Sequence, residues 1–210
     1  NPEKATTYGV GELLLAARDA GCREVILGLG GSCTNDGGAG AAAALGAKFT
    51  KAGGEVFIPT GGTLSQIAEV DCRPVQEALR GMKVQVMCDI DNPLFGKTGA
   101  AAVFAPQKGA DEPMVERLDQ GLRHLGQVTA QCLGQDFSQL PGAGAAGGMG
   151  FGMRAFCGAS LRMGIDLVLE TVSFDQLLQD AALVFTGEGK IDSQSVRGKV
   201  VSGVASHGKR

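Results

Sequence analysis

Short apolar runs alternate with amphipathic stretches along this 210-residue chain. Three apolar runs lack a helical repeat and end in glycine-containing or acidic loops, which is typical of buried strands: residues 24–27, 84–88 and 183–186. Residues 12–20 and 112–133 carry apolar side chains at helical spacing, and Asp111 is placed to cap the second segment. Strands that alternate with helices predict an α/β fold with an at least partly parallel sheet.

Weaker patterns predict the remaining elements. Further helices are expected at residues 39–45, 74–80 and 174–181, and in a glycine-rich segment that runs through Phe156. Further short strands are expected at residues 47–50, 55–58 and 165–168. No internal repeat is visible, so the order of elements is not that of a repeat protein.

The stretch at residues 25–46 is the most informative part of the chain. A short apolar strand ends in a loop with six glycines, and an alanine-rich helix follows. The loop also holds Ser32, Thr34, Asn35 and Asp36, all of which are N-cap residue types. Free N–H groups and the positive end of a helix dipole would meet there, and such a place binds anions. A tight turn without a ligand is the alternative, although six glycines exceed what a turn needs.

Composition excludes several classes of protein. The net charge of −3 and the scattered basic residues argue against a nucleic-acid surface. No apolar run reaches the roughly 18 residues that a membrane span needs. The six cysteines form no C-x-x-C pair, which favours reduced intracellular thiols. We therefore expect a soluble, cytoplasmic protein without a nucleic-acid or membrane partner.

A literal G-x-G-x-x-G occurs at Gly142, Gly144 and Gly147, and Asp166 follows at about the spacing, roughly 20 residues, of a dinucleotide fingerprint. That fingerprint also needs a hydrophobic strand directly before it, and D-F-S-Q-L-P is a poor strand. A nicotinamide-dependent oxidoreductase that uses this loop is kept as an alternative. A Walker A loop is absent from the sequence, so a P-loop ATPase is not expected.

Three other loops combine glycine with a carboxylate or a lysine, at residues 31–38, 106–110 and 186–194, and a fourth, at residues 88–93, carries two carboxylates without a glycine. In parallel α/β sheets, ligands bind beyond the carboxyl ends of the strands. Gathered there, such loops would offer amides and lysines to phosphate and carboxylates to Mg²⁺, the groups that phosphoryl transfer requires. A non-catalytic ligand-binding α/β domain would fit the same loops.

These stretches resemble one family, the bacterial glycerate kinases of the class I type. The matching motifs are T-T-x-G-x-G-E-L at 6–13, G-L-G-G-S-C-T-N-D-G-G-A-G at 28–40, C-D-I-D-N-P-L at 88–94, P-Q-K-G-A at 106–110, P-G-A-G-A-A-G-G-M-G at 141–150 and T-G-E-G-K-I-D-S-Q at 186–194. They follow the family's order over nearly the whole chain.

The resemblance implies a kinase that uses ATP and Mg²⁺ to phosphorylate D-glycerate to 2-phosphoglycerate, in glyoxylate metabolism. It also implies two α/β domains, one Rossmann-like and built from both termini, the other inserted between them. Residues 1–210 would form the central part of such an enzyme: mainly the inserted domain with its borders, without the terminal segments. We expect this part alone to be inactive, and a homodimer is an open alternative.

On this interpretation, Asp192 and Glu188 are the first candidates for holding Mg²⁺ or for acting as general base, and Asp36 and Asp89 are the second. Direct transfer needs a carboxylate within hydrogen-bond reach of the substrate hydroxyl. The predicted contacts to the nucleotide or to a substrate anion are Gly30, Gly31, Ser32, Thr34, Asn35, Lys108 and Lys190.

Overall fold

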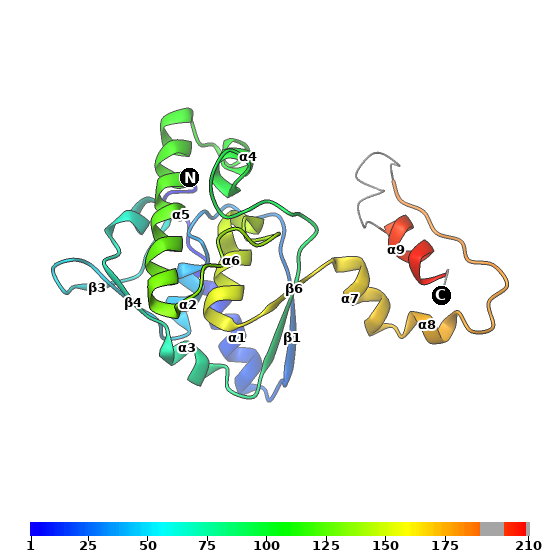
Figure 1. Ribbon diagram of the computed structural model, residues 1–210. Coiled ribbons are helices and arrows are strands. Elements are labelled where there is room, and N and C mark those ends of the chain that lie inside the picture. The colour runs from blue at the N-terminus through cyan, green and yellow to red at the C-terminus, as the bar shows by residue number, and fades with distance from the viewer. Residues whose placement is uncertain (190–199, 209–210) are drawn as a thin grey trace. The chain divides into compact units, whose positions relative to one another are not determined.

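The computed structural model describes residues 1–189 and 200–208, and the chain divides into two compact units. Unit 1 comprises Asn1–Val86 and Ile90–Leu161. Unit 2 comprises Met87–Asp89 and Arg162–Arg210. Helices and both parallel and antiparallel sheets are present, so the predicted α/β class is confirmed (Figure 1).

One sheet has the strand order β1-β5-β6, with β1 at Glu24–Gly28, β5 at Lys83–Met87 and β6 at Ser160–Arg162. The N–H of Lys83 donates to the carbonyl oxygen of Arg23 at 2.9 Å, and that of Cys88 donates to the carbonyl of Arg162 at 2.8 Å. The starts of β1 and β5, and the ends of β5 and β6, therefore lie together, as in parallel strands. The predicted strands at 24–27 and 84–88 are confirmed.

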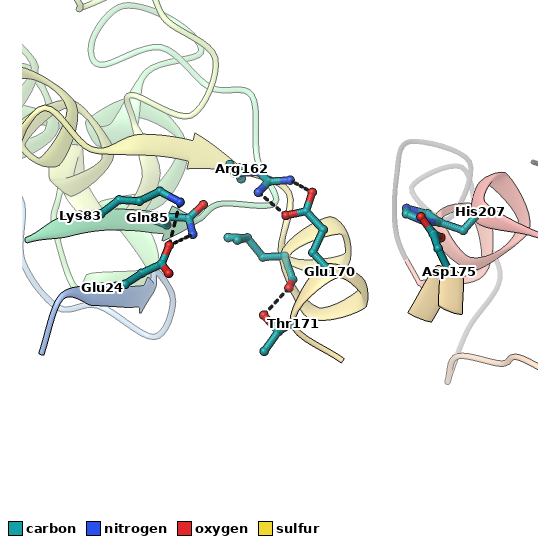
Figure 2. Close-up of polar contacts among 9 residues, drawn as sticks. Glu24, Lys83, Gln85, Arg162, Glu170, Thr171, Asp175 and His207 are labelled. Carbon is teal, nitrogen blue, oxygen red and sulfur yellow. Dashed lines mark hydrogen bonds and ion pairs between the residues drawn. The ribbon is translucent and has the colours of Figure 1, made fainter. Parts of the chain in front are cut away.

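A side-chain cluster links β1 to β5 on this sheet. The Glu24 carboxylate accepts from Lys83 Nζ at 2.7 Å and from Gln85 Nε2 at 2.6 Å (Figure 2). Its hydrogen bond to Lys83, and then that to Gln85, lower the pKa of Glu24. Because Glu24 is exposed, these bonds align the two strands more than they stabilise the fold.

The second sheet is antiparallel with the order β3-β2-β4, and its strands are β2 (Lys48–Thr50), β3 (Val56–Phe57) and β4 (Glu69–Asp71). Phe49 on the central strand pairs with Phe57 on one side and Val70 on the other. Its ring is fully buried and meets the Phe156 ring edge-on, 5.9 Å between centroids. The predicted strands at 47–50 and 55–58 are confirmed.

Helices of unit 1 cover these strands: α1 (Tyr8–Asp19), α2 (Ala39–Ala44), α3 (Arg73–Ala78), α4 (Ala100–Phe104), α5 (Glu112–Leu133) and α6 (Ala145–Cys157), with the 3-10 turns η1 (Gly61–Gln66) and η2 (Pro106–Lys108). The long α5 begins where predicted, since Asp111 accepts from the Met114 N–H at 2.9 Å. It lies beside η1, α4 and β4 (Figure 1) and buries Leu118, Leu122 and Leu125 completely. Within the part of the chain that the structure describes, no helix is both long and apolar enough to cross a membrane.

Unit 2 contains α7 (Gly164–Thr171), α8 (Phe174–Leu177) and α9 (Val200–His207). The strand predicted at residues 165–168 is wrong, because these residues lie inside α7. The strand predicted at 183–186 is also wrong, since no strand forms between residues 181 and 189. A run of four apolar residues fits a helix as well as a strand, and local contacts decide which forms.

Two polar contacts settle the helical outcome for α7. Asp89 Oδ1 accepts from the Gly164 N–H at 2.8 Å at the start of the helix. Arg162, at the end of β6, donates to both carboxylate oxygens of Glu170, which also raises the Arg162 pKa (Figure 2). These contacts hold both ends of a helix that buries Leu167 and Leu169.

Candidate functional site

The glycine loop, residues 29–38, follows β1 and is open at its first part. Gly30 and Gly31 are exposed, and a Cβ added at either would meet nothing within 4 Å. Gly31 has a φ of 60°, a conformation that glycine adopts without strain. The N–H groups of Gly30, Gly31 and Ser32 make no hydrogen bond within residues 1–189 and 200–208. They are therefore available to a ligand anion, and the anion contacts expected at these residues stay predictions.

Lys108 joins this loop from η2, more than 70 residues away along the chain. Its Nζ donates to Ser32 Oγ at 3.0 Å and to the Thr34 carbonyl oxygen at 2.7 Å. An ammonium group has three N–H donors, so one stays without a partner in the described part of the chain. The structure thus brings together two loops that the sequence singled out separately.

The charge of Lys108 is poorly compensated. No carboxylate lies within ion-pair distance of its ammonium group in the described residues. Burial lowers the pKa of Lys108, and the more distant charges of Cys33 and Asp36 oppose that shift only in part. A half-buried cation beside open N–H groups is the electrostatic arrangement that favours an anionic ligand.

Asp36 occupies a different environment from the one expected of a catalytic base. Its carboxylate is fully buried and accepts from the Thr7 N–H at 2.7 Å, Thr7 Oγ1 at 2.9 Å, and the N–H groups of Gly38 and Gly40 at 3.2 and 3.3 Å. Thr7 Oγ1 in turn accepts from the Ala41 N–H at 2.9 Å. Desolvation is the main cause of a raised Asp36 pKa. These contacts favour a positioning role for Asp36.

The same contacts correct the expected location of the anion site. The first N–H groups of α2 already bond to Asp36 and Thr7 within the protein, and α2 is only six residues long. The helix terminus therefore has no donors left for an anion. The candidate site is formed instead by the open N–H groups of the glycine loop, which precedes α2 in the chain, and by Lys108 from η2.

Asn35 is fully buried within the same loop. Neither Nδ2 nor Oδ1 of its amide has a hydrogen-bond partner among the residues that the structure describes. A buried amide without a hydrogen-bond partner lowers the unfolding free energy by about 1–3 kcal/mol, so such a residue is a candidate for a functional role. Asn35 therefore stays a candidate for a polar contact near the anion site, together with Thr34.

The second glycine loop, residues 141–152, packs against the first. The Gly37 N–H donates to the Gly147 carbonyl at 3.0 Å, and Thr34 Oγ1 reaches the Ala146 carbonyl at 3.5 Å. A Cβ at Gly147 would lie 2.0 Å from the Thr34 carbonyl oxygen. No strand precedes this loop at residues 134–144. The G-x-G-x-x-G pattern thus serves close packing, which does not favour the dinucleotide alternative.

The remaining predicted site residues belong to unit 2. Asp89 caps α7, and Glu188 is half-buried with its Oε1 unpaired in the described part of the chain. Lys190 and Asp192 lie outside the described residues. Among residues 1–189 and 200–208, no group of three or more His, Cys, Asp and Glu side chains is placed to hold a metal ion. The metal-binding roles of Glu188 and Asp192 stay predictions.

Unit 2 also has a cavity of about 690 Å³, within the range of ligand sites. Leu183, Val204 and Thr186 line it, and Thr186 opens the predicted 186–194 motif. His207 lines it too, with Nδ1 2.5 Å from Asp175 Oδ1 (Figure 2). Sequence reasoning gave no role to this pair, because the two residues are 32 positions apart.

Comparisons with known proteins identify the family. A protein-family model for glycerate kinases matches residues 1–210, the whole chain. The chain belongs to the glycerate kinase family. The resemblance found in the sequence motifs is thereby confirmed, and so is the assignment as a kinase-family chain.

Individual glycerate kinases are similar in sequence to this chain over its whole length. Glycerate kinase of Bacillus subtilis (strain 168) is 50% identical over 209 residues, which is 100% of this chain and 55% of that protein. Glycerate 2-kinase of Escherichia coli (strain K12) is 45% identical over 210 residues, with the same coverage of 100% and 55%. This glycerate kinase chain thus spans about 55% of the length of these relatives.

A solved structure agrees as well. The crystal structure of a glycerate kinase 2 from Salmonella typhimurium LT2 superposes with a TM-score of 0.91 at 48% identity, covering 100% of this chain and 56% of that one. The glycerate kinase fold is therefore shown for this chain. The expected division into an inserted domain and the borders of a Rossmann-like domain stays a prediction.

Proposed function

We propose that the complete protein phosphorylates D-glycerate with ATP and Mg²⁺ and releases 2-phosphoglycerate. The observation that carries the proposal is the ammonium group of Lys108 beside the open amides of Gly30 and Gly31 in a chain of the glycerate kinase family. Phosphoryl transfer depends mainly on positioning and on neutralising charge, and a fixed cation with free N–H donors provides both.

The glycine loop and Lys108 bind an anion, either a phosphate group of ATP or the carboxylate of glycerate. The free N–H groups of Gly30 and Gly31 lie in the loop that Lys108 contacts, and Lys108 has a third donor without a partner in the described residues. Ser32 keeps the ammonium group oriented through its hydroxyl. Together these donors hold the anion without a change in the fold, because the buried Asp36 network fixes the loop's far end.

Carboxylates of unit 2 provide the base. Asp192 or Glu188 accepts the proton of the glycerate 2-hydroxyl as that oxygen attacks the terminal phosphorus, with Asp89 next in order, and the bond from that phosphorus to the bridging oxygen breaks to release ADP. The unpaired Oε1 of Glu188 is compatible with Mg²⁺, which prefers oxygen ligands and would neutralise charge on the phosphates. Asp36 comes last, because its oxygens already accept four hydrogen bonds.

Other parts of the prediction belong to the same proposal. The substrate is a small organic acid of glyoxylate metabolism, the setting is the cytoplasm, and a homodimer is open to test. Lys190 is proposed as a further contact to phosphate. An oxidoreductase is not favoured. Even a single Cβ added at Gly147 would lie 2.0 Å from the Thr34 carbonyl oxygen, so the loop has no room there for a pyrophosphate.

The proposal is tested on the complete protein by replacing Lys108 with Met. We expect kcat/KM for D-glycerate to fall by roughly 100-fold or more, because one preorganised cation is lost from a charged transition state. Lys97→Met, at an exposed lysine of a nearby loop, serves as the matched control and should be near normal. Near-normal turnover of Lys108→Met would remove the loop from the site.

Two further measurements complete the test. Asp192→Ala should reduce kcat by orders of magnitude while the thermal midpoint stays unchanged, and Asp36→Asn should instead lower the thermal midpoint. Phosphorus NMR of the product distinguishes 2-phosphoglycerate from the 3-isomer. Exclusive formation of the 3-isomer would overturn the assigned hydroxyl but not the kinase.

A further inference from the structure

Two thiols that phosphoryl transfer does not use face each other in unit 1. Cys72 Sγ lies 3.5 Å from Cys132 Sγ, across 60 positions of the chain. Cys72 is the N-cap residue of α3, directly after β4, and Cys132 lies in the last turn of α5. Cys72 is only 4% exposed, whereas Cys132 is exposed to solvent. The Cys132 thiol is thus accessible to a reagent, and the buried Cys72 thiol is in contact with it.

We infer that Cys72 and Cys132 form a redox modification site that hydrogen peroxide converts to a disulfide between α3 and α5. A disulfide bond is about 2.05 Å long, so the two sulfurs need to approach by roughly 1.5 Å. Movement of this size is within reach of side-chain rotation at Cys132, whose exposed position leaves it free to turn.

The chemistry balances as follows. The Cys132 thiolate attacks one peroxide oxygen, the O–O bond breaks, and the departing hydroxide takes up a proton to form water, which leaves a sulfenic acid on Cys132. Cys72 loses its proton and attacks the Cys132 sulfur, the S–O bond breaks, and a second water leaves. Two thiols are oxidised to one disulfide, and one peroxide is reduced to two waters.

The environment of the pair sets this order. Burial, and then the neighbouring Cys132 thiol, raise the pKa of Cys72 to about 11, so Cys72 is a poor first nucleophile. Its position beside Cys132 suits the second step, where proximity compensates for low thiolate content. The two sulfurs are in direct contact in the folded protein.

The cross-link would close a loop of about 60 residues that includes Lys108 but leaves the glycine loop outside. Closing such a loop restricts the unfolded chain, so the oxidised protein should unfold several degrees higher than the reduced one. The inference is independent of the kinase proposal, because mass and stability report it without turnover.

The experiment treats the complete protein with hydrogen peroxide, blocks remaining thiols with iodoacetamide and maps non-reduced peptides by mass spectrometry. We expect a linked peptide pair containing Cys72 and Cys132, a raised thermal midpoint, and reversal of both by dithiothreitol. Cys22→Ser, at an exposed unpaired thiol, should keep these responses, whereas Cys72→Ser and Cys132→Ser should lose them.

Each other outcome would overturn the inference. Cys132 recovered as sulfinic acid or with an iodoacetamide label, and Cys72 recovered free, would show that the pair does not close. A linked pair without a rise in thermal midpoint would show a cross-link made in unfolded protein. The map is made on the unchanged sequence, so a variant that fails to fold does not weaken the test.

Discussion

The ammonium group of Lys108 lies half-buried between Ser32 and Thr34, and burial lowers its pKa below the ordinary value of 10.5. The folded protein therefore binds a proton at Lys108 less readily than the unfolded chain does. At pH values where Lys108 is protonated in both the folded and the unfolded protein, its burial reduces the unfolding free energy. The unfolding free energy then rises as the pH increases from the pKa of the folded protein toward 10.5. Such a cation is poised to gain from an anionic ligand.

The direction of this pH dependence can be tested with Lys108→Met. The unfolding free energies of the unchanged protein and the variant are compared by urea unfolding from about pH 8 to about pH 10.5. The difference in unfolding free energy should shift in favour of the lysine protein as the pH rises, because only that protein has the titrating group. Other groups titrate equally in both and cancel. A difference that stays constant with pH would contradict the inferred burial of the charge.

Thr7 is the second residue with a clear energetic role. Its hydroxyl donates to the buried Asp36 and accepts from the Ala41 N–H. Thr7→Val keeps the shape and removes both bonds, so the unfolding free energy should fall by about 1–3 kcal/mol. Thr7→Ser retains the hydroxyl and should lose less than half as much. Equal losses in the two variants would mean that the two hydrogen bonds of the hydroxyl contribute no more than the methyl group.

At this scale the sequence revealed the polar loops but not the role of each member. Lys108 was selected because its loop pairs lysine with glycine, and the structure brings it to the glycine loop. Asp36 was considered catalytic because capping and catalysis use the same residue types. Its partner Thr7 is 29 positions away, and no local pattern shows such a contact.

At the scale of elements, the two glycine loops interlock. The chain passes Ala146, Gly147 and Gly148 with φ values of 51°, 72° and 90° inside α6. The carbonyls of Ala146 and Gly147 accept hydrogen bonds from the first loop, and the Cα atoms of the two glycines lie close against it. Gly148 would bring a Cβ within 2.8 Å of Gly37 Cα. The glycines therefore set the distance between the two loops.

A matched pair of glycines tests this. Gly147 and Gly134 share a φ near 70° (72° and 70°), but a Cβ at Gly147 meets the Thr34 carbonyl at 2.0 Å whereas one at Gly134 meets nothing within 4 Å. Gly134→Ala should cost about 1–2 kcal/mol of unfolding free energy from the backbone alone. Gly147→Ala should cost at least about 2 kcal/mol more by urea unfolding, because backbone must move. Equal costs would mean that the loops separate easily.

Elements with their own local signals were predicted best. Asp111 and the long apolar repeat predict the helix at residues 112–133, and α5 has these bounds. The segment at 165–168 was misassigned because its helical state depends on Asp89, distant in sequence. The three-residue β6 was missed, since so short a strand has no pattern of its own and forms by pairing with β5.

At the scale of the whole molecule, the two units differ in how much apolar surface they bury. Unit 1 contains nearly all of the fully buried large side chains, such as Phe49, Phe151 and Phe156. Among the described residues of unit 2, few apolar side chains are buried, Leu167 and Leu169 among them, whereas others are exposed, including Leu177 at 67%, Leu183 at 71% and Phe185 at 90%. Local stability follows buried apolar contacts, so the units should open separately.

Amide hydrogen exchange on residues 1–210 measures this. We expect the amides of α7 and α8 to exchange at least about tenfold faster than those of α5, because opening unit 2 exposes little additional apolar surface. Amides on the buried face of α5, around Leu122, are the internal reference. Equal protection in α5 and α7 would indicate that the chain unfolds as one cooperative body.

The contact between the glycine loops has a consequence for folding kinetics. Thr34 and Ala146 are 112 positions apart, so their contact closes most of the chain into a loop, which is entropically slow. The open amides of Gly30 and Gly31 can take their final geometry only after that closure. An anion should therefore bind the native state and not the partly folded states that precede it. The rate at which anion binding appears during refolding would then report the last step of folding.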